Sequence, residues 1–206
     1  QVFNRLCMAQ VMEETHHLLV APKCLQNRVL DFIEEEIHHA DNNEPAYIGV
    51  KMNSLTDKTI IDKMVEASQH GVKIDLVVRG ICCLIPGIEG YTENIRVISI
   101  VGRYLEHSRI YIFGTPERDK MFISSADFMT RNTVKRVEVA TPIYDTAIKD
   151  RVRTMFGIML HDTVKGRELC RDGNYYRREK PQEESEVISS QAYFSNEAYL
   201  AASKNV

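Results

Sequence analysis

A strand–helix–strand pattern in the first half of the chain constrains the fold more than any other feature. Residues 47–52 and 74–78 are predicted as short strands, and the second is a nearly continuous apolar run, which is typical of a buried strand. Residues 57–70 between them are predicted as a helix that Thr56 or Asp57 caps, with an apolar face made of Ile60, Ile61, Met64 and Val65. Strand, helix and strand with short connections predict a crossover unit in a sheet that helices cover.

The rest of the chain supplies further strands and two further helices. Leu25, Val29, Ile33 and Ile37 recur every four residues, which predicts a helix with one apolar stripe. The acidic run 34–36 falls mostly on the solvent-facing side of this helix. A loop with proline and glycine follows at 81–90. Strands are also predicted at 18–20, 95–101, 109–113, 121–124 and 137–141, and a last helix at 146–160.

Composition excludes several classes of protein. The chain has 206 residues, enough for one domain or one domain plus a tail, and a formal net charge of −3. Nothing global therefore attracts a polyanion, and anion binding must come from a local cluster of Arg, Lys or His. No apolar run approaches the ~20 residues that span a bilayer. The five cysteines include no CxxC pair, so neither a disulfide framework nor a zinc site is predicted.

An arginine at the end of a buried strand is the first candidate for anion binding. Arg79 follows the strand at 74–78 and precedes Gly80, and ligands of open α/β sheets lie at the carboxyl ends of strands. A guanidinium stays charged and can donate two hydrogen bonds to two phosphate oxygens. Position alone fits an arginine paired with a carboxylate equally. Neither GxxxxGK(S/T) nor GxGxxG occurs, so no standard nucleotide-binding loop is predicted.

His107 and Arg109 form the second candidate. They flank Ser108 at the start of the strand at 109–113, and strand alternation puts both on one face. Both side chains can then contact one anion, with the histidine as phosphoryl acceptor or general acid and the arginine as the cation that holds the phosphate. A structural histidine at a strand edge is the alternative.

Other candidates are weaker taken alone. Residues 124–127 (SSAD) put small hydroxyl groups at a strand end, where they can donate to phosphate or orient an imidazole. Arg136 and Glu138 share one face of the strand that they open, as surface pairs also do. Lys51 and Asn53 share a face at another strand end and could contact phosphate, although a solvated lysine fits as well.

Four longer motifs resemble those of the polyphosphate kinase family. They are residues 77–87 (VVRGICCLIPG), 94–113 (NIRVISIVGRYLEHSRIYIF), 124–132 (SSADFMTRN) and 136–142 (RVEVATP). The resemblance begins near Leu18 and runs to about Arg167. It implies a lead-in from an upstream domain over residues 1–17, the C-terminal phospholipase-D-like domain of a polyphosphate kinase over 18–167, and a polar tail over 168–206.

The resemblance implies a phospholipase-D-like α/β fold, a mixed sheet flanked by helices on both faces. It also implies an activity, the reversible transfer of the terminal phosphate of ATP to inorganic polyphosphate through a phosphohistidine in an upstream half. ATP or ADP is the nucleotide, and the Mg²⁺ ligands are expected outside these residues. The partners implied are polyphosphate, upstream domains of the same polypeptide and further copies of the full enzyme, but no nucleic acid. A cytoplasmic location is expected, with membrane association a further possibility for the full enzyme.

By the same resemblance, His107 is the second-half histidine near the nucleotide, with Arg109 beside it as a catalytic cation. Arg79 matches the nucleotide-binding arginine of the family, and Arg136 and Glu138 match positions that line the same tunnel. Gly114 departs from the phospholipase D pattern His-x-Lys-x4-Asp, as does the arginine at position 109. Both changes are expected where a site holds a polyphosphate chain.

Three readings of function remain. The first is half of a phosphotransferase site that is inactive alone. The second is a phospholipase-D-like phosphodiesterase or nuclease that pairs two copies of His107 in a dimer. The third is a non-catalytic module that binds polyphosphate and mediates assembly.

Overall fold

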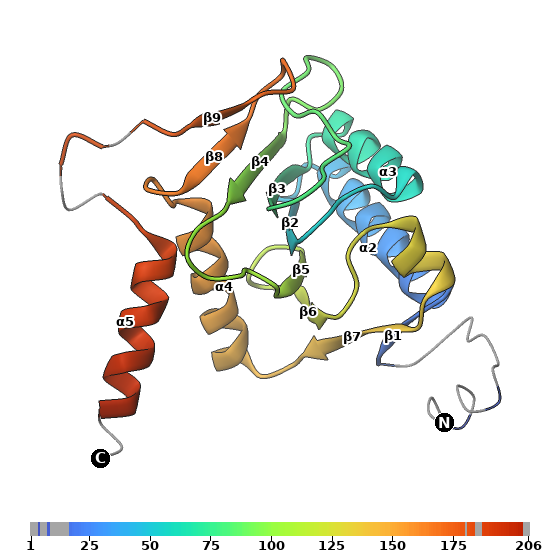
Figure 1. Ribbon diagram of the computed structural model, residues 1–206. Helices are drawn as coiled ribbons and strands as arrows, with labels where there is room; N and C mark the ends of the chain where they lie inside the picture. Colours follow the sequence, from blue (N-terminus) through green and yellow to red (C-terminus); the bar gives the residue numbers. More distant parts are fainter. Residues whose placement is uncertain (1–3, 5–7, 9–16, 180, 184–186, 204–206) are drawn as a thin grey trace.

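The predicted crossover unit lies at the centre of a mixed sheet in the computed structural model, which describes residues 4, 8, 17–179, 181–183 and 187–203 (Figure 1). In chain order the elements are β1 (Leu19–Ala21), α2 (Cys24–Asp41), β2 (Tyr47–Met52), α3 (Lys58–Gln69), β3 (Lys73–Val78), β4 (Ile95–Ile100), β5 (Arg109–Phe113), β6 (Lys120–Ser124), the π-helix η1 (Arg131–Lys135), β7 (Glu138–Ile143), α4 (Thr146–Leu160), β8 (Gly166–Leu169), β9 (Tyr175–Arg177) and α5 (Ser190–Ser203).

The described strands form one sheet in the order β1-β7-β6-β5-β2-β3-β4-β8-β9. The β2–β3 and β3–β4 pairs are parallel, with Tyr47 opposite Lys73 in the first of them. Strand β5 pairs with β2 in the antiparallel direction, and the remaining pairs of the sheet are antiparallel too. The α/β mixed sheet expected from the sequence is therefore confirmed.

Helices cover both faces of the sheet, as predicted (Figure 1). On one face α2 and α3 bury their apolar stripes, among them Ile33 and Met64, against the larger core cluster. On the other face α4 packs Phe156 against a second cluster. Strand β5 contributes to both, because its alternating side chains point to opposite faces: Tyr111 joins the first cluster and Ile112 the second. The central strands are mainly apolar because both of their faces are buried, with Lys51 of β2 and Asp75 of β3 as buried charged exceptions.

Local chemistry sets the start of α3. Asp57 is its N-cap, and the carboxylate accepts a hydrogen bond from the backbone N–H of Ile60 at 3.3 Å. Gln26 and Thr133 also donate to this carboxylate, at 2.8 and 2.5 Å. Asp57 is only 1% exposed, so the cap also ties α2 and η1 to the start of α3. The sequence correctly placed the cap at this position.

The acidic run of α2 lies only partly on the solvent-facing side. Glu34 and Glu35 are partly exposed, whereas Glu36 is 2% exposed. Its carboxylate forms an ion pair with Arg118 and accepts the backbone N–H of Tyr47 at 3.0 Å. The reason lies at the far end of β5, where Gly114 has a φ of +100° and leaves room for the Arg118 guanidinium. A buried carboxylate is tolerated here because it is paired.

The C-terminal region contains more structure than a polar tail. Strand β8 pairs with β4, β9 pairs with β8, and α5 lies beside α4 (Figure 1). Phe194 of α5 packs against the second core cluster, and Arg151 of α4 lies 3.5 Å from Glu197 of α5. Most of the predicted lead-in, residues 1–17, lies outside the described residues. No helix in the described part of the chain is both long and apolar enough to cross a membrane.

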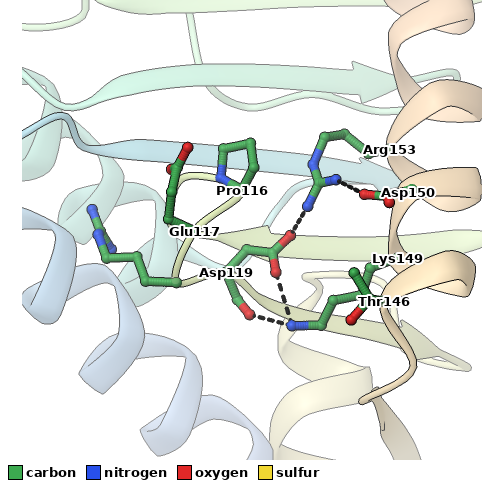
Figure 2. A pocket seen from close by; sticks show the side chains of 8 residues that line it. Pro116, Glu117, Asp119, Thr146, Lys149, Asp150 and Arg153 are labelled. Atoms are coloured by element: carbon green, nitrogen blue, oxygen red, sulfur yellow. Dashed lines mark hydrogen bonds and ion pairs between the residues drawn. The ribbon is translucent and has the colours of Figure 1, made fainter.

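A cleft of about 420 Å³ between the β5–β6 turn and α4 is lined mainly by charged side chains (Figure 2). Asp119 lies at its base and is 6% exposed. Lys149 donates to its carboxylate at 2.8 Å and to its carbonyl at 2.6 Å, and Arg153 binds the other carboxylate oxygen. The cations of this cleft are paired, so we interpret it as the contact that anchors α4 to the sheet and not as an anion site.

We expect Asp119→Asn to lower the free energy of unfolding by about 1–3 kcal/mol, because Lys149 and Arg153 lose the negative charge that they share. Urea denaturation of the wild type and the variant measures the difference. Glu117→Gln is the matched control, since Glu117 lines the same cleft but is exposed, and it should stay within about 0.5 kcal/mol of wild type. Equal losses in the two variants would contradict the anchoring role.

Candidate active site

The predicted site residues gather where several strands end at one edge of the sheet. Strands β2 and β3 are parallel, so Asn53 and Arg79, which follow them, emerge at the same edge. Strand β5 runs antiparallel to β2, so its first residue, Arg109, lies at that edge too. Arg109 is paired with Ser124, the last residue of β6, which brings Asp127 into the same place. Carboxyl ends of parallel strands are the usual ligand position in open α/β sheets.

Asp127 is the common partner of this group. Its carboxylate accepts hydrogen bonds from Arg109, at 3.2 Å from Nε and 3.1 Å from the second terminal nitrogen. It also accepts the backbone N–H of Asn53 at 2.7 Å and the side-chain amide of Asn53 at 3.1 Å. The side-chain oxygen of Asn53 in turn accepts Nε of Arg79 at 2.7 Å. One buried carboxylate thus links both candidate arginines.

The electrostatics of Asp127 follow from these contacts. Asp127 is 6% exposed. Burial alone would raise the pKa of its carboxyl, but the hydrogen bonds from Arg109 and from the Asn53 backbone outweigh burial and hold the pKa below its usual value. The side chain therefore stays ionised and offsets the charge of Arg109.

His107 and Arg109 lie side by side, as strand alternation predicted. A terminal nitrogen of Arg109 donates to Nδ1 of His107 at 3.0 Å. A guanidinium has donors only, so Nδ1 must be the acceptor, and the neutral imidazole carries its proton on Nε2. His107 is exposed. Its Nε2–H forms no hydrogen bond with the described residues and can therefore donate one to a ligand at this edge.

Cations hold the backbone around His107 on both sides. The carbonyl of Glu106 accepts Nε of Arg79 at 2.8 Å, and the carbonyl of His107 accepts Arg109 at 2.9 Å. The carbonyl of Ser108 accepts Nζ of Lys51 at 3.1 Å. The position of the imidazole is thus set by three cationic side chains from three strands or strand ends.

Lys51 does not take the role that the sequence suggested as one possibility. It is 1% exposed, and its ammonium lies 3.6 Å from the Glu106 carboxylate. Burial lowers the pKa of Lys51, although Glu106 opposes the shift. The side chain therefore supports the His107 loop from beneath and cannot reach a phosphate in solvent.

Local packing gives a structural reason for two glycines, Gly80 and Gly114. At Gly80 a Cβ would lie 2.7 Å from the carbonyl of Asn53, so the close approach is between two backbone segments. Gly114 follows the far end of β5, about 16 Å from Arg109 at ~3.3 Å per residue. Its departure from the phospholipase D pattern therefore accommodates the Glu36–Arg118 pair rather than a polyphosphate chain.

Arg136 and Glu138 lie further along the same edge. Glu138 accepts the side-chain amide of Asn132 at 2.6 Å and binds the hydroxyl of Ser125. Arg136 is exposed, and its guanidinium forms no hydrogen bond or ion pair with the residues that the structure describes. Strand β7 is separated from β5 by β6, so described contacts connect neither residue to His107 or Arg79.

The sequence did not indicate that Asp127 and Asn53 connect the two candidate arginines. In the SSAD motif the hydroxyl groups were the predicted ligand contacts. The Ser124 hydroxyl instead donates to the backbone carbonyl of Val139 at 3.3 Å, and the aspartate of the motif, Asp127, binds Arg109. An acidic residue just beyond a strand end, opposite an arginine, was the available signal. Within the described residues, no group of three or more His, Cys, Asp or Glu side chains could hold a metal ion.

The fold resembles that of known phospholipase D relatives. The phospholipase D family member Nuc from Salmonella typhimurium superposes with a TM-score of 0.54 at 16% identity, covering 74% of this chain and 96% of Nuc. This likeness concerns the fold alone. A crystal structure of polyphosphate kinase from Porphyromonas gingivalis matches far more closely, with a TM-score of 0.88 at 34% identity, over 98% of this chain and 31% of that one.

Sequence comparison identifies the family. A family model described as polyphosphate kinase C-terminal domain 2 matches residues 18–191. The polyphosphate kinase of Bacillus cereus is 52% identical over 174 residues, which cover 84% of this chain and 25% of the relative. That of Staphylococcus epidermidis is 46% identical over 196 residues, which cover 95% and 26%. The chain therefore belongs to the polyphosphate kinase C-terminal domain 2 family, as its motifs suggested, and spans about a quarter of the length of these relatives.

The shared carboxylate at the site makes stability depend on pH. The folded-state pKa of Asp127 lies below its ordinary value of 3.8, so its stabilisation is present above that pH and is lost as the pH falls through the folded-state pKa. We expect Asp127→Asn to be less stable than wild type by about 1–3 kcal/mol near neutral pH, with the gap shrinking below about pH 4. Denaturant unfolding at several pH values measures this gap.

The control is Asp31→Asn, which removes an exposed carboxylate that lies 3.2 Å from Arg28 on the surface of α2. A surface pair contributes little, so this variant should stay within about 0.5 kcal/mol of wild type at each pH. A constant gap between wild type and Asp127→Asn from neutral to acidic pH would show that the ionised form of Asp127 has no special role.

Proposed function

We propose that this chain supplies the C-terminal part of a polyphosphate kinase active site. The reaction is the reversible transfer of the terminal phosphate of ATP to inorganic polyphosphate through a phosphohistidine on an upstream part of the polypeptide. The observation that supports this best is the convergence of His107, Arg79 and Arg109 on one edge of the sheet, fixed by Asp127 and Asn53. Family membership supports the choice of substrates.

Arg79 is suited to bind phosphate oxygens. Its Nε is committed to Asn53 and to the carbonyl of Glu106. Its two terminal nitrogens form no hydrogen bond with any residue in the described ranges, so they remain available for an anion. An arginine anchored through Nε presents its terminal nitrogens in a fixed plane, which favours bidentate binding of phosphate.

Each step of the proposed transfer is a displacement at phosphorus, in which one bond forms as another breaks. The bond between the terminal phosphorus of ATP and the ADP oxygen breaks as a bond to the upstream imidazole nitrogen forms. The phosphorus–nitrogen bond then breaks as a terminal oxygen of polyphosphate attacks. In both steps negative charge spreads over the transferred oxygens, and Arg79, Arg109 and the Nε2–H of His107 stabilise it.

The isolated 206-residue chain should bind short polyphosphate but not synthesise it, because covalent transfer needs the upstream acceptor histidine. Incubation with labelled ATP, magnesium and a primer should give neither polymer nor acid-labile label on the protein. Efficient synthesis would contradict the proposal that this chain holds only part of a site. Cleavage of a phosphodiester substrate would support the phospholipase-D-like alternative instead.

Binding by the isolated chain is measured by calorimetry with a short polyphosphate at low and moderate salt. Affinity should fall as salt rises, since binding a polyanion releases counterions. Arg79→Ala should weaken binding about tenfold or more, by loss of charge-assisted hydrogen bonds. Arg151→Ala removes the same charge from α4, where that side chain is 68% exposed, and should bind like wild type. Equal affinities in all three proteins would remove Arg79 from the site.

In the complete enzyme, His107→Ala should lower the turnover number at least about a hundredfold, because losing one preorganised donor to the transferred oxygens typically costs about 10²- to 10³-fold. His107→Gln keeps a side-chain N–H donor of similar reach, so it should recover part of this loss. Steady-state synthesis is compared for the three proteins after thermal melts show that each is folded. Near-normal rates in both folded variants would make His107 a structural residue.

A further inference from the structure

The start of α5 is fixed to the end of α4 by a buried carboxylate. Asp162 and Ser190 are both 0% exposed. The carboxylate of Asp162 accepts the backbone N–H of Ser190 at 2.8 Å and its hydroxyl at 2.6 Å. Its other oxygen accepts the backbone N–H groups of residues 164–166, between 2.7 and 3.1 Å. The first turn of α5 therefore has a defined position on the body of the domain.

This position directs the next residue, Gln191, into the loop that carries His107. Gln191 is 7% exposed. Its side-chain oxygen accepts the backbone N–H of Tyr104 at 3.0 Å, and its side-chain nitrogen donates to the carbonyl of Tyr104 at 2.8 Å. The same nitrogen donates to the carboxylate of Glu106 at 3.1 Å. A single side chain thus binds the loop on both backbone groups of one residue and on the residue just before His107.

The sequence of the loop is adapted to this contact. A Cβ on Gly102 would lie 2.5 Å from the side-chain oxygen of Gln191 and 3.0 Å from its amide carbon. The atoms in the way belong to the amide that binds Tyr104 and Glu106, so a shift of this amide changes those bonds. Any residue other than glycine at position 102 therefore displaces Gln191, which gives an independent way to test the contact.

Glu106 connects Gln191 to the rest of the site. One of its carboxylate oxygens binds Gln191, and the other lies 3.6 Å from the buried ammonium of Lys51. Its backbone carbonyl accepts Arg79, at 2.8 Å. Lys51 and Arg79 hold the loop from the sheet, and Gln191 holds it from α5. Loss of the Gln191 side chain would remove the three hydrogen bonds that join the loop to the first turn of α5.

We propose that Gln191 is a positioning residue for His107, acting through the loop at 102–108. It does not contact the site anion; it fixes the backbone from which the imidazole projects. The C-terminal helix is accordingly part of the catalytic apparatus through its first turn. The kinetic consequence rests on the proposed phosphotransferase function, whereas the clamping of the loop is a property of the chain alone.

The test compares two variants that break the contact from opposite sides. Gln191→Leu keeps a side chain of similar size but can neither accept the Tyr104 N–H nor donate to the Tyr104 carbonyl and the Glu106 carboxylate. Gly102→Ala keeps the glutamine at position 191 but puts a Cβ where its side-chain amide lies. Asn196→Ala is the control, because Asn196 is an exposed amide on the same helix. In the complete enzyme, both test variants should lower kcat about ten- to hundredfold, while KM for ATP changes less than about threefold.

Hydrogen exchange of the isolated chain measures directly how firmly the loop at 102–108 is held. The Tyr104 amide, which donates to Gln191, should exchange about tenfold faster in both test variants and unchanged in Asn196→Ala. Wild-type kcat in both test variants, or a lower kcat without faster exchange at Tyr104, would overturn the proposal. If the wild-type enzyme makes no polyphosphate at all, the proposed function fails, and the exchange data alone then decide whether Gln191 clamps the loop.

Discussion

The carboxylate of Asp127 is the contact on which the candidate site depends. Two guanidinium groups at one sheet edge repel each other, and an imidazole between them adds no counter-charge. Asp127 binds Arg109 directly, at 3.1 Å, and reaches Arg79 through Asn53. A buried carboxylate with several donors stays ionised and keeps its geometry. The two guanidinium groups are thereby fixed relative to the sheet, an arrangement that would favour the proposed phosphoryl transfer because the cations need no reorganisation.

The sheet explains why these residues meet. Residues 53, 79 and 109 are separated by long stretches of sequence, yet they end or begin neighbouring strands β2, β3 and β5. Rigid strands buried on both faces define where each backbone emerges. Gly80 allows the backbones after β2 and β3 to approach closely, with its N–H 2.7 Å from the carbonyl of Asn53. The loop before β5 then lies across these ends, where Lys51 and Arg79 bind it.

Local sequence patterns were sufficient for most elements and insufficient for pairings. Strand β2, helix α4 and the Asp57 cap were predicted correctly because apolar spacing and capping are local properties. The motifs also identified the family, and with it the fold. The burial of Glu36 was not predicted, because its partner, Arg118, is 82 residues away.

The same limit applies to the site. The alternation of His107 and Arg109 could be seen in the sequence, since the two residues are only two positions apart. The junction of Asn53 with Asp127 spans 74 residues, and that of Glu106 with Gln191 spans 85. Nothing in a polar C-terminal stretch indicated that one of its glutamines would be buried against a loop. Such contacts depend on tertiary structure and become visible only when the strands and helices are in place.

The order of the strands has a consequence for the solution behaviour of the domain. The two outer strands of the described sheet, β1 and β9, have three residues each. An edge strand exposes unpaired backbone groups that can recruit a strand from another molecule, and short edges limit this hazard. Strand β9 also ends on Arg177, whose charge opposes intermolecular pairing. Both edges of the described sheet therefore offer little backbone for pairing with another molecule, which favours a domain that stays monomeric when it is purified alone.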